Sequence, residues 1–164
     1  MENKKIAIVP GSFDPITVGH VDIIKRASEM YDHVYVAVMI NNAKKYMFTI
    51  EQRKNIAQSA VSDISNVTVI SSEGMLWELA KSFGACAIVK GYRNENDLVY
   101  EQEMASFNRE HYPDAETVLL RSNEDLVGVS STLVREKILS CADLSALLPQ
   151  GAIDEIYKII PRSI

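Results

Sequence analysis

Five short, largely apolar runs, separated by longer stretches with helical spacing, constrain the fold of this chain most. The runs lie at residues 6–9, 33–40, 67–70, 87–89 and 117–120. They are nearly continuous rather than alternating, which is typical of strands covered on both faces. Helical stretches between successive runs favour parallel pairing through right-handed crossovers. The sequence therefore predicts an α/β fold, a Rossmann-like, doubly wound, five-stranded parallel sheet with helices on both faces.

Local signals predict where several helices begin and end. Thr49 and Gln52 have the spacing of a capping box, so a helix is expected to begin after Thr49. Gly84 follows an apolar helical stripe and is expected to end it. Either Ser130 or Ser131 is expected to cap the helix that follows the fifth strand. Further helices are expected over about 95–109 and around 153–160.

Length and composition are those of one globular domain spanning residues 1–164. The hydrophobic fraction of 47% and the charged fraction of 24% are ordinary for such a domain. A net charge of −5 argues against a general nucleic-acid binder. No apolar run approaches the roughly 20 residues of a membrane span, and residues 1–5 leave no room for a signal peptide before the first strand. We expect a cytoplasmic protein whose partners include neither nucleic acid nor a membrane.

The two cysteines predict no redox or metal framework. Cys86 and Cys141 lie far apart in the sequence, each in apolar surroundings. Two cysteines without close spacing favour neither a zinc site nor a set of disulfides. The chain also has no cluster of acidic residues suited to a metal cage, so no metal site built from protein residues is expected.

Residues 9–20 form the turn between the first strand and the first helix, and this turn is suited to phosphate. Gly11 lets the backbone pass close to a ligand, and Gly19 leaves room beside His20 at the helix start. A helix N-terminus offers free N–H groups and the positive end of its dipole. His20 can donate to a phosphoryl oxygen there. The alternative is that glycine and proline only shape a loop and that His20 is a surface residue.

Polar residues follow four of the predicted strands at their carboxyl ends. Ligands of doubly wound sheets bind at this edge, close to the point where the strand order reverses. The residues in question are Ser12, His20, Lys44, Lys90, Gly91, Arg93, Ser130, Ser131 and Thr132. Their convergence favours a site for a phosphate-rich ligand.

Each of these residues also has an ordinary structural interpretation. Lys44 fits a solvated loop, and the serines fit helix caps. Lys90 and Arg93 could pair with Glu95 or Asp97. The functional interpretation depends on all of them meeting at one edge of the sheet.

Residues 10–20, Pro-Gly-Ser-Phe-Asp-Pro-Ile-Thr-Val-Gly-His, resemble the signature of the nucleotidylyltransferase superfamily, whose usual form is His-x-Gly-His. Thr17 stands where the first histidine would be, a form typical of the bacterial phosphopantetheine adenylyltransferases. The match continues, in order and with matching spacing, through 44–49, 90–93, Asp97, 100–101 and 129–136. The resemblance covers nearly the whole chain.

The resemblance implies a transfer of AMP from ATP to 4′-phosphopantetheine, which gives dephospho-coenzyme A and pyrophosphate in coenzyme A biosynthesis. The substrate phosphate would attack the α-phosphorus in line, without a covalent enzyme intermediate. Positioning and charge stabilisation can drive such a reaction, and the sequence offers no obvious nucleophile beside a base. The resemblance also implies Mg²⁺ accompanying ATP, a homohexamer, and coenzyme A as a feedback inhibitor.

The resemblance further implies roles for individual residues. His20, Lys44 and Ser12 would be catalytic. The residues expected to contact ATP are Ser12, Phe13, His20, Gly91, Tyr92, Arg93, Glu101, Leu126, Val127, Gly128, Val129, Ser130, Ser131 and Thr132. The residues expected to hold phosphopantetheine are Ser12, Lys44, Leu76 and Lys90.

Two positions depart from the family pattern, and two other functions stay open. Ser12 stands where threonine is frequent and keeps the hydroxyl, whereas Lys90 replaces the usual arginine and loses its bidentate geometry. One alternative is another nucleotidylyltransferase that acts on nicotinamide mononucleotide or forms a CDP-alcohol, and Thr17 counts against it. The other is a non-catalytic regulatory module that binds nucleotides, and an intact His20 counts against that.

Overall fold

The computed structural model describes residues 3–162, so both ends of the expected 1–164 domain lie outside the described residues. Its strands are β1 (Ile6–Gly11), β2 (His33–Met39), β3 (Val67–Ser72), β4 (Ala87–Tyr92) and β5 (Glu116–Arg121). Its helices are α1 (Val18–Met30), α2 (Ile50–Ala60), α3 (Leu76–Phe83), α4 (Glu95–His111), α5 (Ser131–Leu139) and α6 (Gln150–Ile159), with a 3₁₀ turn at Glu124–Leu126.

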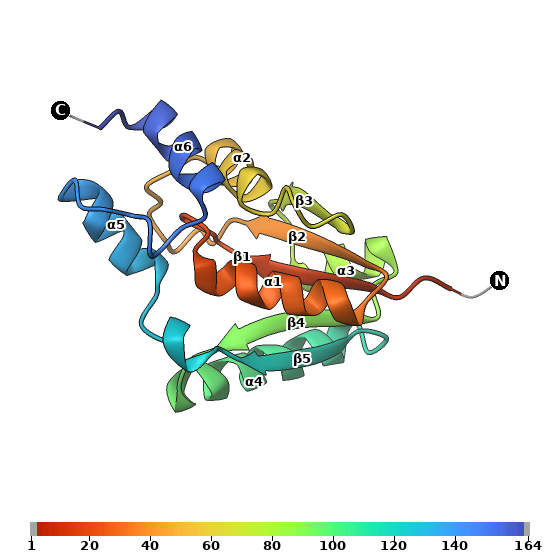
Figure 1. Ribbon diagram of the computed structural model, residues 1–164. Helices are drawn as coiled ribbons and strands as arrows, with labels where there is room; N and C mark the ends of the chain where they lie inside the picture. The colour runs from red at the N-terminus through yellow and green to blue at the C-terminus, as the bar shows by residue number, and fades with distance from the viewer. Residues whose placement is uncertain (1–2, 163–164) are drawn as a thin grey trace.

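The five strands form one parallel sheet, as predicted, and their order in it is β3-β2-β1-β4-β5 (Figure 1). The helices α1 and α2 cover one face, with α5 and α6 packed beside them, and α3 and α4 cover the other face. Alternate residues of each strand enter the two cores: Val36 and Val38 pack toward α1 and α2, and Ala37 packs toward α3. Both faces are therefore buried, which explains the nearly continuous apolar runs.

Helix boundaries follow the local signals closely. The Thr49–Gln52 capping box is present at the start of α2, and Gly84 ends α3 in the left-handed region with φ of 62°. Ser130, rather than Ser131, caps α5, because its hydroxyl accepts the N–H of Leu133. Sequence and structure therefore agree wherever a boundary depends on neighbouring residues.

Several elements extend beyond their predicted ends, and this changes where Lys90 lies. The strands β1, β3, β4 and β5 continue past the apolar runs that predicted them, because ladder hydrogen bonds do not require apolar side chains. Lys90 and Gly91 accordingly lie within β4, and not after it as the apolar run predicted. The helix α4 likewise continues to His111 rather than ending near residue 109.

The strand order reverses at β1, and this places the edge where a ligand is expected. From β1 the chain passes through α1 and β2 to β3, and it then crosses back to β4 on the other side of β1. Gly91 permits α1 to lie close to β4 here, since a Cβ on this residue would be 3.0 Å from Cγ1 of Ile23. The carboxyl ends of β1 and β4 therefore meet beside the N-terminus of α1.

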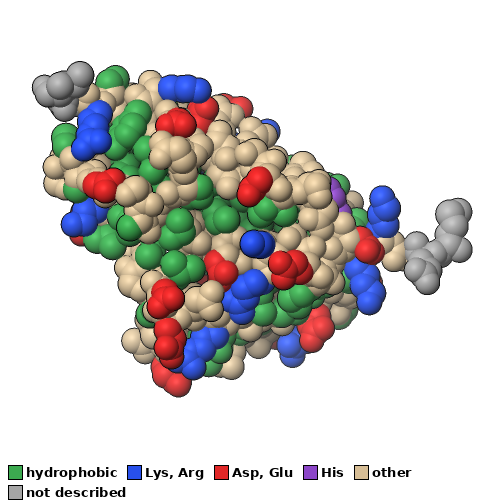
Figure 2. Space-filling model, viewed as in Figure 1, with side chains coloured by type: hydrophobic (Ala, Val, Ile, Leu, Met, Phe, Trp, Pro, Cys, Tyr) green, Lys and Arg blue, Asp and Glu red, His purple; other side chains and the backbone are tan. Residues whose placement is uncertain are grey.

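The surface of the described residues differs from the expectation at the two cysteines. Cys86 and Cys141 are exposed free thiols, not residues in apolar surroundings, because each lies just outside the packed elements that flank it. Acidic and basic side chains are interspersed on the face in Figure 2. Within residues 3–162, no helix is long and apolar enough to cross a membrane.

Candidate active site

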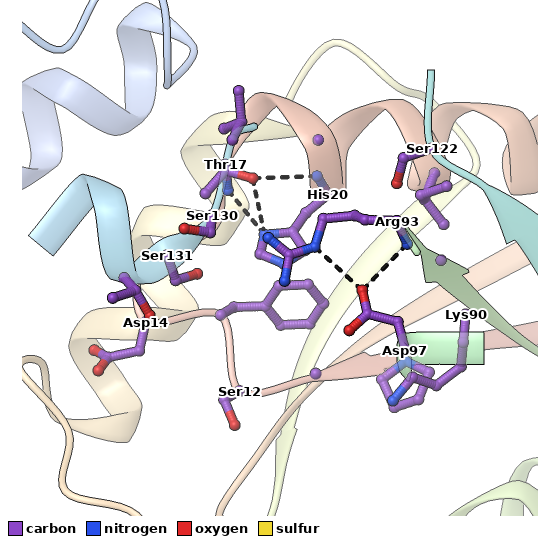
Figure 3. Close-up of a pocket in the computed structure, with 18 of the residues that line it drawn as sticks. Ser12, Asp14, Thr17, His20, Lys90, Arg93, Asp97, Ser122, Ser130 and Ser131 are labelled. Carbon is purple, nitrogen blue, oxygen red and sulfur yellow. Dashed lines mark hydrogen bonds and ion pairs between the residues drawn. The ribbon is translucent and has the colours of Figure 1, made fainter. Parts of the chain in front are cut away.

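A cavity of about 580 Å³ lies at the carboxyl ends of β1 and β4 (Figure 3). The β1–α1 turn, the loop after β2, β4, α4 and the start of α5 all contribute to its lining. The structure brings these predicted site residues together around it: Ser12, Phe13, His20, Lys44, Lys90, Gly91, Arg93, Glu101, Leu126, Val129, Ser130, Ser131 and Thr132. Segments that are far apart in the sequence, from Val9 to Arg135, therefore meet at one site.

Four of the predicted residues lie elsewhere. Leu76 lines a neighbouring cavity of about 190 Å³. Tyr92 is the last residue of β4. Val127 and Gly128 are exposed in the turn before α5. These last three are not among the residues that line the main cavity.

Phe13 forms the wall on which His20 rests. Its backbone has φ of 48°, its side chain is buried, and its ring meets the His20 ring edge-on at 5.0 Å between centroids. A Cβ at Gly11 would lie 2.9 Å from Cζ of Phe13. A side chain at residue 11 would therefore clash with the Phe13 ring. This packing explains the glycine directly, whereas the sequence suggested a close approach of the backbone to a ligand.

Thr17 fixes the orientation and the proton of His20. The Thr17 side chain caps α1, and the Thr17 backbone N–H donates to Nδ1 of His20 at 3.0 Å. Because Nδ1 accepts this bond, the single proton of the neutral ring lies on Nε2. Burial, and then the positive charges of Arg93 and Lys90, lower the pKa of His20 to about 4. His20 is therefore a neutral Nε2–H donor at physiological pH.

We expect the His20 ring to stay neutral down to about pH 4. Its pKa in the folded protein lies below the ordinary value of 6.5, so the unfolded chain takes up this proton first as the pH falls. The contribution of His20 to the free energy of unfolding is thus complete above about pH 6.5 and is lost as the pH falls toward 4. An NMR titration measures this, with His20→Gln identifying the signal, and an inflection near 6.5 would contradict it.

The cations of the cavity are partly neutralised by carboxylates on α4. Arg93 Nε lies 3.2 Å from Oδ2 of Asp97, one of the pairings expected from the sequence. Lys90 Nζ pairs with Oε1 of Glu101 at 3.1 Å, rather than with Glu95 or Asp97, the partners considered from the sequence. Residues 97 and 101 are one helical turn apart, so both carboxylates face β4. Lys44 is exposed in the loop after β2.

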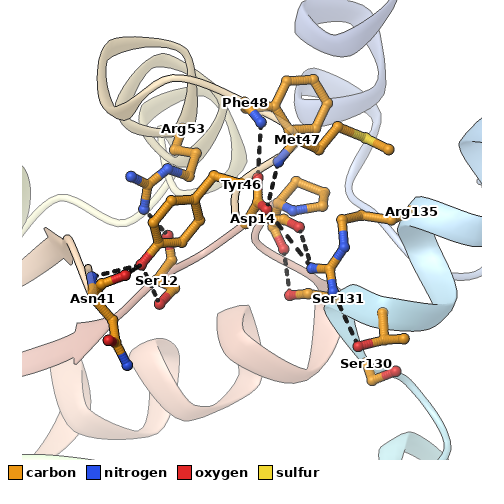
Figure 4. A network of polar contacts seen from close by, with 12 residues as sticks. Ser12, Asp14, Asn41, Tyr46, Met47, Phe48, Arg53, Ser130, Ser131 and Arg135 are labelled. Carbon is orange, nitrogen blue, oxygen red and sulfur yellow. Dashed lines mark hydrogen bonds and ion pairs between the residues drawn. The ribbon is translucent and has the colours of Figure 1, made fainter. Parts of the chain in front are cut away.

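Asp14, a residue of the 10–20 motif for which no role was predicted, connects the β1–α1 turn to two other segments (Figure 4). Its carboxylate is buried and accepts the backbone N–H groups of Met47 at 2.9 Å and Phe48 at 3.0 Å. Arg135 donates to the Asp14 carbonyl at 2.8 Å, and Ser131 Oγ donates to the Pro15 carbonyl at 2.8 Å. The β1–α1 turn therefore ties the Lys44 loop to α5.

A pattern in the sequence indicated one of these residues, Arg135. Arg135 follows Ser131 by four residues in α5, so the two side chains share a helix face and reach the same turn. No sequence pattern indicated the bonds of the Asp14 carboxylate with Met47 and Phe48, because these residues lie 33 and 34 positions away.

Comparisons with known proteins agree with this arrangement. The Cytidylyltransferase-like family model matches residues 8–137. Phosphopantetheine adenylyltransferases are 41% identical in Streptococcus equi subsp. zooepidemicus (94% of both chains), 44% in Lactobacillus acidophilus (93% of this chain, 96% of that one) and 42% in Rubrobacter xylanophilus (96% of both).

A solved structure from Vibrio parahaemolyticus, assigned as a nicotinate-nucleotide adenylyltransferase, has the same fold. It superimposes with a TM-score of 0.75 at 19% identity, covering 95% of this chain and 93% of that one. The sequence identity to the three phosphopantetheine adenylyltransferases is far higher than 19% and extends over almost their whole length, so it decides the family. The chain belongs to the phosphopantetheine adenylyltransferase family.

Proposed function

We propose that this protein transfers the adenylyl group of ATP to 4′-phosphopantetheine and releases dephospho-coenzyme A and pyrophosphate. Family membership supports the reaction. The observation that carries the mechanism is a neutral His20, held by Thr17 at a helix N-terminus, in a cavity that Lys44, Lys90 and Arg93 also line. Such a site gathers phosphates and offers a hydrogen-bond donor to them.

The chemistry is a direct in-line displacement. An oxygen of the substrate phosphate forms a bond to the α-phosphorus of ATP as the bond to pyrophosphate breaks. Ser12 is not set up as a nucleophile, since its hydroxyl contacts Tyr46 Oη at 3.4 Å and not a general base. His20 Nε2–H donates to the α-phosphate as charge builds there, and Lys44 and Lys90 offset the repulsion between the two anions.

The second cavity suits the pantetheine arm. It adjoins the first, because Lys90 and Glu101 line both. The other residues of its wall include Met75, Leu76 and Met104. A substrate whose phosphate meets Lys90 would extend its long uncharged arm into this apolar space, which supports the role proposed for Leu76.

The opposite side of the main cavity suits ATP. Leu126, Val129 and residues 130–132 surround the N-terminus of α5, whose free N–H groups favour the β- and γ-phosphates. Mg²⁺ would be held chiefly by those phosphates and by water. The carboxylates of Asp97 and Glu101 are engaged with Arg93 and Lys90, so they leave the ion to the nucleotide.

Pyrophosphate release tests the proposal directly. With ATP and Mg²⁺, we expect rapid release with 4′-phosphopantetheine and far slower release with nicotinamide mononucleotide. CTP with an alcohol phosphate should give none above background. Turnover of nicotinamide mononucleotide alone would favour the other adenylyltransferase function, and nucleotide binding without any turnover would favour a regulatory module.

Family membership also motivates proposals about the whole protein. We propose a single nucleotidylyltransferase domain over residues 1–164, a homohexamer, feedback inhibition by coenzyme A and a cytoplasmic location. Light scattering coupled to gel filtration measures the oligomeric state. Inhibition assays with coenzyme A at varied ATP measure the feedback.

Ser131→Ala is expected to weaken ATP binding more than phosphopantetheine binding. Its hydroxyl donates to the Pro15 carbonyl and so holds α5 against the β1–α1 turn. Losing this bond should lower the free energy of unfolding by about 1 kcal/mol. Ser140→Ala at the other end of α5 serves as the control, because its hydroxyl also donates to a backbone carbonyl, that of Lys137, but lies outside the main cavity. Calorimetric ATP titrations and thermal melts separate the effects, and a lower Tm with unchanged ATP affinity would leave Ser131 a purely structural role.

A further inference from the structure

Arg53 is a buried guanidinium directly behind the wall of the main cavity. Its side chain is 1% exposed, although it lies on the first turns of α2. It takes part in none of the ion pairs of residues 3–162, and its Nε has no hydrogen-bond partner. Burial of a cation without a carboxylate is costly. An arginine here therefore calls for a role that an apolar residue could not fill.

The contacts of Arg53 join the ends of two strands. Its Nη1 donates to the carbonyl of Ser12 at 2.7 Å and to the carbonyl of Met39 at 3.0 Å. Ser12 follows β1, and Met39 is the last residue of β2. Both segments turn into loops that reach the cavity, so one guanidinium fixes the points where the two loops begin (Figure 4).

Tyr46 extends this connection to the loop that carries Lys44. The Arg53 guanidinium lies 3.9 Å from the centroid of the Tyr46 ring, which is a favourable cation–π distance. The Tyr46 hydroxyl accepts the Asn41 N–H at 2.6 Å and lies 3.4 Å from Ser12 Oγ. Lys44 is only two residues away from Tyr46. The loop is thereby docked against Ser12.

We propose that Arg53 is a positioning residue for adenylyl transfer, which holds Ser12 and the Lys44 loop in register so that both meet the same substrate phosphate. The proposal rests on the proposed function. Arg53 does not line the cavity and so acts through Ser12 and Tyr46. The role depends on the guanidinium plane, because Nη1 bonds both carbonyls while the plane lies over the Tyr46 ring, and an ammonium group has no plane to stack there.

Arg53→Lys tests the geometry because it keeps the charge. We expect kcat/KM for phosphopantetheine to fall roughly tenfold or more, the effect expected when a hydrogen bond to a charged group is lost. The KM for ATP should change much less, because Arg53 holds Ser12 and the Lys44 loop, which supply two of the four residues proposed for phosphopantetheine, whereas Ser12 is only one of many residues proposed for ATP. Lys54→Met is the matched control on the next residue of α2, and it should retain wild-type kinetics.

Two further variants keep the proposal falsifiable if Arg53→Lys folds poorly. Tyr46→Leu removes the ring from a half-buried loop position and should raise the KM for phosphopantetheine in the same selective way. In a Ser12→Ala background, Tyr46→Leu should have a smaller effect than in the wild type, because part of its action passes through Ser12.

Three outcomes would overturn the assignment. They are equal changes in both KM values, full multiplicativity of Ser12→Ala with Tyr46→Leu, or wild-type kinetics for Arg53→Lys with only a lowered Tm. Wild-type protein that forms no dephospho-coenzyme A would instead refute the proposed function itself.

Discussion

His20→Ala is expected to lower kcat by about 10²–10³-fold, the usual loss when one preorganised donor to a developing charge is removed. Thr17 holds the ring through Nδ1, and the pKa of about 4 keeps the ring neutral, so Nε2–H is already aimed and protonated before ATP binds. An interaction that strengthens as charge builds on the α-phosphate affects kcat and leaves ground-state ATP binding nearly unchanged.

The measurement must separate catalysis from helix capping. His20 completes the capping box of α1, so alanine also removes an acceptor for the Thr17 N–H. His20→Gln is the matched control, because glutamine at this helix position restores the box. Single-turnover rates and calorimetric ATP affinities should be compared at equal folded fractions. Near-normal kcat in His20→Ala would remove this residue from the mechanism.

Lys90→Ala is expected to raise the KM for phosphopantetheine roughly ten- to a hundredfold, the effect of losing a charged hydrogen bond. Lys90 lies within β4, so its backbone is fixed by the sheet, and its side chain lines both cavities where they adjoin. The KM for ATP should rise only weakly. Lys90→Arg should be tolerated, because arginine keeps the charge and can still pair with Glu101.

The ion pair with Glu101 supplies the competing explanation for Lys90. If Lys90 only neutralises that carboxylate, the double variant Lys90→Ala/Glu101→Gln should recover a wild-type KM for phosphopantetheine. If Lys90 binds the phosphate itself, the double variant should stay impaired for phosphopantetheine. Both KM values are needed on variants whose Tm matches the wild type, and recovery in the double variant would refute the phosphate role.

The sequence by itself determined the strands of this fold and the parallel sheet that they form. The apolar runs found all five strands, because a strand buried on both faces must be apolar at nearly every position. The Thr49–Gln52 box and Gly84 marked helix ends correctly, since capping depends on residues three or four positions apart. The edge of the sheet at which the polar residues converge followed from topology alone.

Tertiary structure alone decided which side chains meet at that edge and in what state. Lys90 pairs with Glu101 rather than Asp97 because the packing of α4 on β4 sets their register. The contact of Arg53 with Ser12 spans 41 positions, and no local pattern encodes it. The contact of Arg135 with Asp14 spans 121 positions, and the spacing from Ser131 marks only the helix face on which Arg135 lies, not its partner. The lowered pKa of His20 likewise arises from burial and from Arg93 and Lys90, which folding brings to it from β4 and the segment just after it. Periodicity specifies which face of an element is buried, but the contacts between distant elements depend on how those faces pack together.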